Sequence, residues 1–470
     1  MPSELCTLSA AGLIDLYRNR RASPVEATRA ILQRIDALNP TLNAFCFVAA
    51  DALEQAAASE ARWMRGAPQG PLDGVPISIK DLLLTKGWPT LRGSKTVDAA
   101  GPWLDDAPAV ARVRESGAVL LGKNTTPEFG WKGVTDSPLT GVTRNPWNPA
   151  KTPGGSSGGG AAAVAGGMGP LTIGTDGGGS IRIPCAFTGL FGLKPSFGRV
   201  PAWPISPFGT VAHLGPMTRT VSDAALLLTV IARPDVRDWF ALPYDARDYG
   251  EGLDDGVRGW RIGYSADLGH AAVDPEIAAI VERAARRFVE LGAHVEDVTL
   301  DCSGVEEVFR RHWFTGAANL LRHHTEAQKA LMDPGLVDVA EQGARIGMLD
   351  LLEAAQQRAA LGARMNRFHE TYDLLLTPSL PLAAFDAGRD VDDVMKDKRW
   401  TEWTPFTYPF NLTQQPAASI PCGLTGDGLP VGLQIVGPRY EDARVLRAAR
   451  AFETLQPIPI CDPELTTLGA

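Results

Sequence analysis

The residues of this 470-residue chain with the clearest chemical potential are one lysine and several serines set among glycines. They fall in three segments, residues 78–81, 153–159 and 174–182. Twelve of the 49 glycines lie between Gly154 and Gly179. Such a concentration predicts close backbone approaches or dihedral angles that other residues avoid.

A run of three glycines before Ser180 could present several backbone N–H groups to one small volume, because no Cβ atom stands in the way. Such a group of donors stabilises an oxyanion, although a structural turn or a phosphate-binding loop would need the same freedom. A P-loop requires Gly-Lys-Ser/Thr after its glycines, and a dinucleotide loop requires G-x-G-x-x-G between a strand and a helix. The run matches neither pattern.

Ser157 offers a different interpretation, since residues 155–159 fit the G-x-S-x-G pattern of an α/β-hydrolase nucleophile. That pattern needs a strand before it, and residues 145–149 (Asn-Pro-Trp-Asn-Pro) cannot form one. It also needs a late histidine, and the last one, His369, falls in a predicted helix. The sequence therefore favours a serine whose base is not a histidine.

Lys80 is the best candidate for that base among the ten lysines, because it ends an apolar strand. Burial lowers the pKa of a lysine and lets the neutral amine accept a proton. The S-x-x-K pattern of penicillin-binding proteins is absent. The plain alternative is that Lys80 simply pairs with Asp81.

Taken together, Lys80, Ser156 and Ser180 resemble the amidase signature family. The resemblance lies in the phrases G-G-S-S-G-G and G-T-D-x-G-G-S-I-R-x-P and in the spacing of 24 positions from Ser156 to Ser180. It covers about residues 74–228 and resumes over about 373–452. It implies a single large α/β domain with a central mixed sheet flanked by helices, and hydrolysis of a carbon–nitrogen bond without metal or cofactor.

Carried over by position, the resemblance implies that Ser180 is the nucleophile that forms an acyl-enzyme, releasing ammonia or an amine. Ser156, after a cis peptide bond from Gly155, would bridge Ser180 to the base Lys80. The backbone amides of Gly177, Gly178, Gly179 and Ser180 would form the oxyanion hole. Three further residues would support the site: Thr175, Asp176 and Arg182. Many relatives carry a larger residue at position 177, so its glycine predicts a looser loop and a smaller pocket wall.

Two other functions compete with a stand-alone amidase. The A subunit of the glutamyl-tRNA amidotransferase shares the fold and the triad, but it works within a complex; Ile183 and residues 131–143 look unlike that protein. A catalytically inactive binding scaffold is the other, and the presence of all three triad positions argues against it.

Trp131 and Ile183 are the predicted substrate contacts. Further aromatic candidates are Phe129, Trp203, Phe208 and Trp313. An apolar pocket of this kind would favour hydrophobic amides, anilides or related carbamates over glutamine.

Composition narrows the cellular context. The net charge is −9 and no basic cluster stands out beyond residues 18–21, so we expect a small-molecule amide as partner and no direct nucleic-acid binding. The six dispersed cysteines predict reduced thiols rather than a disulfide framework or zinc site. With no signal peptide and no membrane-length apolar stretch, the expectation is a cytoplasmic protein away from membranes, monomeric or homodimeric.

The elements that must position these residues alternate between helices and short apolar strands, as in a layered α/β fold. The first 60 residues read as helical, with a capping box at Ser23 and a helix stop at Asn39-Pro40. Strands are predicted at residues 75–80, 118–121, 294–300, 373–378 and 429–436, and helices at 109–116 and 274–292. We expect one domain over residues 1–470, comprising N-terminal helices (1–70), a catalytic core (74–230) and a helical subregion (303–371) over the sheet edge or the site.

Overall fold

A mixed sheet of eleven strands runs through the computed structural model, which describes residues 2–392, 399–459 and 461. Its strands are β1 (Phe45–Val48), β2 (Pro76–Lys80), β3 (Val119–Asn124), β6 (Leu171–Asp176), β7 (Phe191–Lys194), β8 (His213–Thr218), β9 (Arg261–Tyr264), β10 (His294–Asp297), β11 (Leu374–Pro378), β12 (Ala417–Leu424) and β13 (Pro430–Val436). Their spatial order is β1-β3-β2-β6-β8-β7-β12-β13-β11-β9-β10. A separate hairpin pairs β4 (Asp136–Ser137) with β5 (Gly141–Val142).

Strand β2 lies between β3 and β6 and is parallel to both. All five residues of β2 are buried, as expected for a parallel strand covered on both faces. Because parallel neighbours end at the same edge of a sheet, the last residue of β2, Lys80, comes beside the last residues of β6, Thr175 and Asp176. The sheet topology thus brings together residues about a hundred positions apart in the chain.

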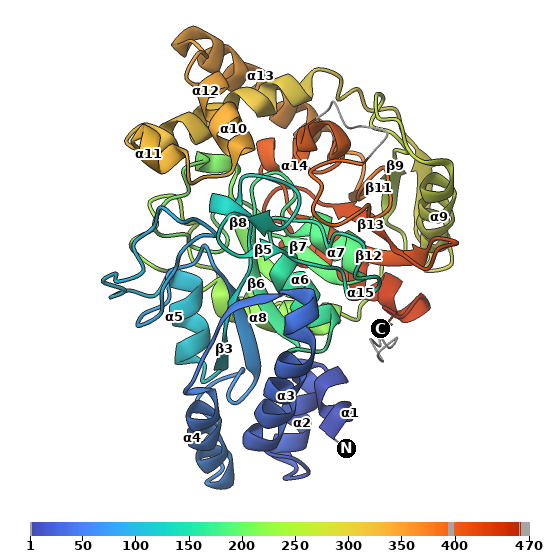
Figure 1. The fold of residues 1–470 in the computed structure, drawn as a ribbon. Coiled ribbons are helices and arrows are strands. Elements are labelled where there is room, and N and C mark those ends of the chain that lie inside the picture. Colours follow the sequence, from blue (N-terminus) through green and yellow to red (C-terminus); the bar gives the residue numbers. More distant parts are fainter. Residues whose placement is uncertain (1, 393–398, 460, 462–470) are drawn as a thin grey trace.

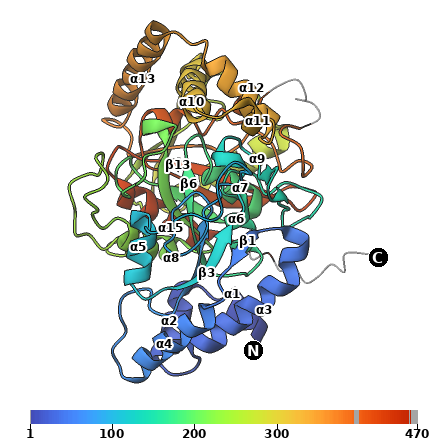
Figure 2. The same ribbon diagram turned by 60° about the vertical axis from the view of Figure 1, so that its left-hand side comes forward.

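Helices cover both faces and both ends of this sheet. They are α1 (Pro2–Thr7), α2 (Ala10–Arg18), α3 (Pro24–Leu42), α4 (Ala52–Met64), α5 (Pro108–Glu115), α6 (Gly158–Ala165), α7 (Arg182–Thr188), α8 (Val221–Ile231), α9 (Pro275–Arg286), α10 (Val305–Leu321), α11 (Glu326–Lys329), α12 (Pro334–Gly343), α13 (Met348–Phe368), α14 (Pro409–Leu412) and α15 (Asp442–Leu455). Helices α1–α4 gather at one end of the molecule and α10–α13 at the other (Figures 1 and 2). The expected α/β fold is confirmed. No helix in the described ranges is long and apolar enough to span a bilayer.

Helix α6 explains part of the glycine cluster by packing. Its eight residues, all Gly, Ala or Val, are completely buried. A Cβ atom on Gly159 would lie 2.3 Å from Thr125 Oγ1, so this helix reaches its neighbours only without side chains there. A helix set this deeply fixes the residues just before it, Ser156 and Ser157, against the sheet.

The N-terminal region differs from expectation in two ways. Helix α3 continues through Pro40 to Leu42 instead of stopping at Asn39-Pro40. The Asn39 side chain accepts from the backbone amides of Ala44 and Phe45, which stabilises the end of the helix beyond the proline, and Leu42 is buried. The prediction of helices throughout the first 60 residues is also wrong, because β1 interrupts them and pairs antiparallel with β3.

Strand β10 is shorter than expected, four residues rather than residues 294–300. It lies at the edge of the sheet and pairs with β9 alone, so backbone hydrogen bonds to neighbouring strands hold fewer of its residues. The other predicted strands and the helical character of residues 303–371 agree with the structure.

Candidate active site

Lys80 is the centre of the site. Its side chain is 1% exposed, and its Nζ lies 2.7 Å from Ser156 Oγ, 2.8 Å from Ser157 Oγ and 2.8 Å from Thr175 Oγ1. Burial lowers the pKa of Lys80 well below its usual value, and the negative charge of Asp176 only partly opposes this effect. The site therefore holds an amine that loses its proton more readily than an ordinary lysine, within hydrogen-bond distance of three hydroxyl groups.

The alternative pairing of Lys80 with Asp81 is not observed. Asp81 faces the other buried lysine of this sheet edge, with its carboxylate 3.6 Å from Lys123 Nζ. Lys123 also donates to the Leu83 carbonyl at 2.6 Å and to Thr90 Oγ1 at 2.8 Å, and burial lowers its pKa to about 8. Lys80 and Asp81, although adjacent in the chain, thus belong to separate polar clusters.

The two neighbouring serines have different surroundings. The Ser157 hydroxyl donates to the Thr175 carbonyl at 3.1 Å and accepts from the Thr175 amide at 3.3 Å. Ser156 follows a cis peptide bond from Gly155 and lines a cavity, whereas Ser157 is not among the residues that line it. The Ser157 side chain is therefore placed as a structural tie to β6, which removes the α/β-hydrolase interpretation.

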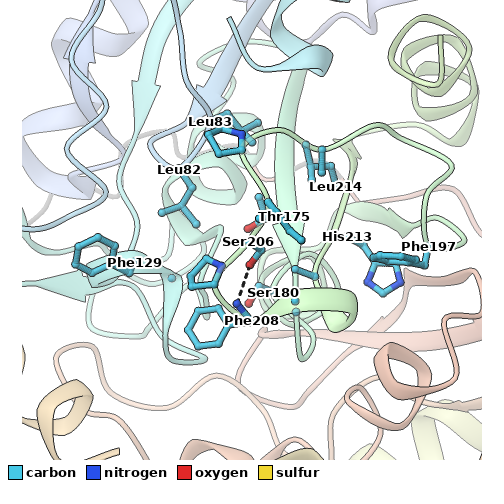
Figure 3. A pocket seen from close by; sticks show the side chains of 18 of the residues that line it. Leu82, Leu83, Phe129, Thr175, Ser180, Phe197, Ser206, Phe208, His213 and Leu214 are labelled. Atoms are coloured by element: carbon cyan, nitrogen blue, oxygen red, sulfur yellow. Dashed lines mark hydrogen bonds between the residues drawn. The ribbon is translucent and has the colours of Figure 1, made fainter. Parts of the chain in front are cut away.

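The cavity beside Lys80 has a volume of about 630 Å³. Ser156, Thr175, Gly177 and Ser180 contribute to its lining, and Ser180 lies in the short connection between β6 and α7. Figure 3 shows Thr175 and Ser180 at the centre of this cavity. Leu82, Phe129 and Phe208 lie on one side of them, and Phe197, His213 and Leu214 on the other. The wall is largely apolar around a polar centre.

Asp176 and Arg182 form a buried ion pair behind the connection, with both side chains fully buried. Burial alone would raise the pKa of Asp176, but the Arg182 charge and its hydrogen bonds hold that pKa well below its usual range. Arg182 also donates to the carbonyl of Thr407 and to the side chains of Gln434 and Asn411. The pair therefore braces the loop against β13 and α14, as expected from the sequence.

The predicted oxyanion hole is only partly available. The amide of Gly179 donates to Asp176 Oδ1 at 2.8 Å, so it is committed to bracing the loop. Within the described ranges, no hydrogen bond uses the amides of Gly177, Gly178 or Ser180. Gly177 and Ser180 line the cavity, so their unused amides and that of the intervening Gly178, rather than that of Gly179, are the candidate donors.

The glycine at position 177 does not make the cavity wall smaller. A Cβ atom at this position would lie 2.7 Å from Cζ3 of Trp313, which comes from α10 and lines the cavity. Trp313 stacks on Phe208, with ring centroids 3.7 Å apart and planes inclined by 7°. The expectation of a smaller wall is wrong because a tryptophan from a distant helix supplies the missing bulk.

The two predicted substrate contacts lie behind the cavity. Trp131 is 4% exposed, its Nε1 donates to Asp333 Oδ2 at 3.1 Å, and its carbonyl accepts from Trp313 Nε1 at 3.0 Å. Ile183 is fully buried beside Gly154 and Gly179. Neither belongs to the cavity lining, because packing against α10, α12 and the glycine loops covers them. Of the other aromatic candidates, Phe129, Phe208 and Trp313 line the cavity, whereas Trp203 does not.

Several lining residues were not anticipated from the sequence. They are Leu82, Leu83, Arg92, Phe197, His213, Leu214, Asp238, Phe240, Asn319 and Leu320, among others. Only the position of Leu82 and Leu83, directly after the strand that ends at Lys80, offered a sequence signal. Among the described residues, no group of His, Cys, Asp and Glu side chains is arranged to hold a metal ion.

Known proteins resemble this chain in sequence and in fold. The family model described as Amidase matches residues 26–446. An acylamidase from Rhodococcus erythropolis is 38% identical over 460 residues, which cover 96% of both chains. The A subunit of the glutamyl-tRNA(Gln) amidotransferase from Myxococcus xanthus is 38% identical over 464 residues, covering 92% of this chain and 94% of that protein.

A solved structure of the same family has a similar fold. The crystal structure of a bacterial aryl acylamidase of the amidase signature enzymes superposes with a TM-score of 0.88 and 35% identity, over 96% of each chain. The family model covers most of the chain, and the relatives match it nearly end to end. The chain therefore belongs to the amidase family and is an amidase signature hydrolase, an enzyme that acts on carbon–nitrogen bonds.

Proposed function

We propose that this amidase works through an acyl-enzyme on Ser180, with Lys80 as the base and Ser156 between them. The observation that carries the proposal is the environment of Lys80, a buried amine in contact with Ser156 beside the cavity that Ser180 lines. A serine without a histidine needs another base, and a desolvated lysine is a known alternative.

The hydrogen bonds around Lys80 suit proton transfer. A neutral amine has two N–H donors and one lone pair. Ser157 gives its own proton to the Thr175 carbonyl and therefore accepts one N–H from Lys80. The second N–H and the lone pair remain for Ser156 and Thr175, so the lone pair can take the proton of the Ser156 hydroxyl.

In the acylation step, Ser180 Oγ attacks the amide carbon as its proton passes to Ser156 and the Ser156 proton passes to Lys80. The carbonyl π electrons move to the oxygen, where the amides of Gly177, Gly178 and Ser180 stabilise the negative charge. One such donor contributes about 3 kcal/mol to the transition state. The carbon–nitrogen bond then breaks as the proton returns through Ser156 to the leaving nitrogen, and the amine or ammonia departs.

In the second step, water attacks the ester carbon of the acyl-enzyme. The same groups take a proton from the water and return one to Ser180 Oγ as the carbon–oxygen bond breaks. The products are a carboxylic acid and free Ser180. Neither step requires a metal or a cofactor.

The substrate class we propose is hydrophobic amides, anilides or related carbamates. Leu82, Phe129, Phe208 and Trp313 give the cavity an apolar wall on the side of α10. Removing apolar surface from water stabilises a bound ligand by roughly 25 cal/mol per Å². An acylamidase and an aryl acylamidase among the relatives support this class.

A second candidate is the A subunit of a glutamyl-tRNA amidotransferase complex. It is favoured by the similarity to the Myxococcus xanthus protein, which has the same 38% identity as the acylamidase. A glutamine site needs buried polar partners for the ammonium and carboxylate groups, and such a site rejects a hydrophobic analogue. The apolar wall argues for the first candidate.

The experiment is to measure kcat/KM of the isolated chain for an acyl anilide, benzamide, acetamide and glutamine. We expect the phenyl-bearing amides to exceed acetamide by about one to two orders of magnitude, as burial of a phenyl group predicts. If kcat/KM for glutamine exceeds that for the phenyl-bearing amides by about tenfold, the amidotransferase subunit becomes the favoured function. Release of neither ammonia nor amine from any of them would favour a binding scaffold.

We also propose the cytoplasm as the compartment and a monomer or homodimer as the assembly. Cys185, Cys302 and Cys422 are buried free thiols, which supports a reducing environment. Sedimentation of the purified chain would test the assembly.

A further inference from the structure

Arg92 lines the same cavity as Ser156 and Ser180, and its side chain is partly buried. No lysine and no other arginine belongs to the described lining, and Asp238 is the one carboxylate there. The Asp238 carboxylate is already used, because it accepts from the amides of Ala202 at 2.8 Å and Phe240 at 2.7 Å. Arg92 is therefore the fixed positive charge of the wall.

The guanidinium of Arg92 has no ion-pair or hydrogen-bond partner among the described residues. Asp81 is the acidic residue that interacts electrostatically with the Arg92 guanidinium. That carboxylate is occupied by Lys123 and by the backbone amides of Arg92 and Gly93, which lower the pKa of Asp81 against the effect of its burial. Burial lowers the pKa of Arg92, so the protein compensates the charge of this guanidinium only weakly.

The backbone at Arg92 is held in place. Its φ of +57° lies in the left-handed region, which residues other than glycine rarely adopt. Its carbonyl accepts from the Phe129 amide at 2.7 Å, and the following Gly93 approaches the Thr126 carbonyl so closely that a Cβ would lie 2.6 Å from it. The held backbone fixes the direction in which the Arg92 side chain leaves this turn.

We propose that Arg92 forms an anion subsite of the amide-binding cavity and selects substrates that carry a carboxylate away from the scissile bond. This inference rests on the proposed function, and it narrows the substrate class to amides with an apolar body and one acidic group. The planar guanidinium offers two parallel N–H donors that match a carboxylate. Glutamine meets the carboxylate requirement but lacks the apolar body.

Matched substrate pairs test this subsite. On the acyl side, the pair is succinanilate and 4-methylpentananilide; on the amine side, it is 4-acetamidobenzoate and 4-isopropylacetanilide. Each pair differs by a carboxylate in place of an isopropyl group of similar shape. The quantity measured is the ratio of kcat/KM for the acidic member to kcat/KM for the neutral member, which does not depend on the fraction of active enzyme.

We expect the wild-type ratio to exceed one for at least one pair, and Arg92→Gln to lower it by about 10- to 100-fold, as for loss of a charge-assisted hydrogen bond. Arg92→Lys keeps the charge without the planar fork and should lower the ratio less. Arg20→Gln is the matched control, because Arg20 also has a positive φ of 55° but is exposed and outside the cavity lining. It should leave the ratio unchanged.

A wild-type enzyme that hydrolyses the neutral members and prefers them in both pairs would overturn the anion subsite and leave the proposed function standing. So would Arg92 variants whose ratio equals that of the wild type. An enzyme that hydrolyses none of the four anilides while releasing ammonia from glutamine would overturn the proposed substrate class and this inference with it.

Discussion

Trp313 occupies the space that a side chain on residue 177 would need, since a Cβ atom on Gly177 would lie 2.7 Å from its ring. The ring is fixed by stacking on Phe208 and by the hydrogen bond from its Nε1 to the Trp131 carbonyl at 3.0 Å. Trp131 thus acts from behind the wall, by holding the tryptophan that faces the cavity. A side chain at residue 177 and the Trp313 ring of α10 would therefore compete for the same space.

Gly177→Thr should therefore lower kcat/KM for an anilide by about tenfold or more, because overpacking displaces either Trp313 or the loop that carries Ser180. Adding Trp313→Leu to the same chain should recover part of that loss. Gly362→Thr is the control, because nothing lies within 4 Å of a Cβ atom there. Full activity of Gly177→Thr alone would contradict the shared volume.

Covalent labelling should identify the nucleophile. A sulfonyl fluoride or fluorophosphonate is expected to modify Ser180, because that hydroxyl lines the cavity, and to leave Ser157 unmodified, because its hydroxyl is bound to β6. Peptide mass spectrometry locates the adduct, and Ser180→Ala should abolish it. An adduct on Ser157 would restore the hydrolase interpretation of residues 155–159.

Lys80→Ala should reduce amide turnover by about two to four orders of magnitude, the usual contribution of a general base. An activated ester should lose less, because its leaving group needs no proton. Near-normal amide turnover in this variant would exclude Lys80 as the base.

The pH profile of the wild type carries a second prediction about Lys80. In the proposed mechanism the neutral amine is the active form, so kcat/KM should rise as the pH rises through the pKa of Lys80. Since burial lowers that pKa well below its usual value, the rise should be complete well below pH ~10.4, the ordinary lysine pKa. A rate that keeps increasing up to that pH would mean that Lys80 is charged at neutral pH.

Asp176→Asn should lower the free energy of unfolding by about 3–5 kcal/mol, because it leaves Arg182 charged and buried without its partner. The pKa of Asp176 is depressed in the folded state, so the stabilisation is fully present above about pH 4 and declines only in stronger acid. Urea denaturation followed by circular dichroism measures it. Asp386→Asn, which removes an exposed pair with Lys151, is the control and should change stability little.

The sequence was sufficient to predict the residues around Lys80, because they lie in contiguous motifs at the end of a buried strand or directly before a buried helix. The roles of Ser156 and Ser180 remain predictions that labelling and substitution test. The capping box at Ser23 is likewise confirmed, since both of its hydrogen bonds are local.

The cavity wall could not be predicted in the same way. Whether an aromatic residue lines a cavity or lies behind it depends on helices that arrive from elsewhere in the chain, as Trp131 and Trp313 demonstrate. Strand β1 was missed for a similar reason, because four residues become a strand only through their pairing with β3. Arg92 gave no signal, since its exposure to the cavity depends on a turn held by Asp81 and Phe129.

Helix α10 contributes Trp313 and Leu320 to the wall, whereas the amine and hydroxyls of the site come from residues 80–180. Part of the substrate wall is thus encoded far along the sequence from the residues that we propose carry out the reaction. Exchange of the α10 segment between relatives therefore has to preserve the fit between residues 313 and 177, because a clash there reaches the loop that carries Ser180. For protein engineering, positions 177 and 313 are therefore best randomised together, as a pair.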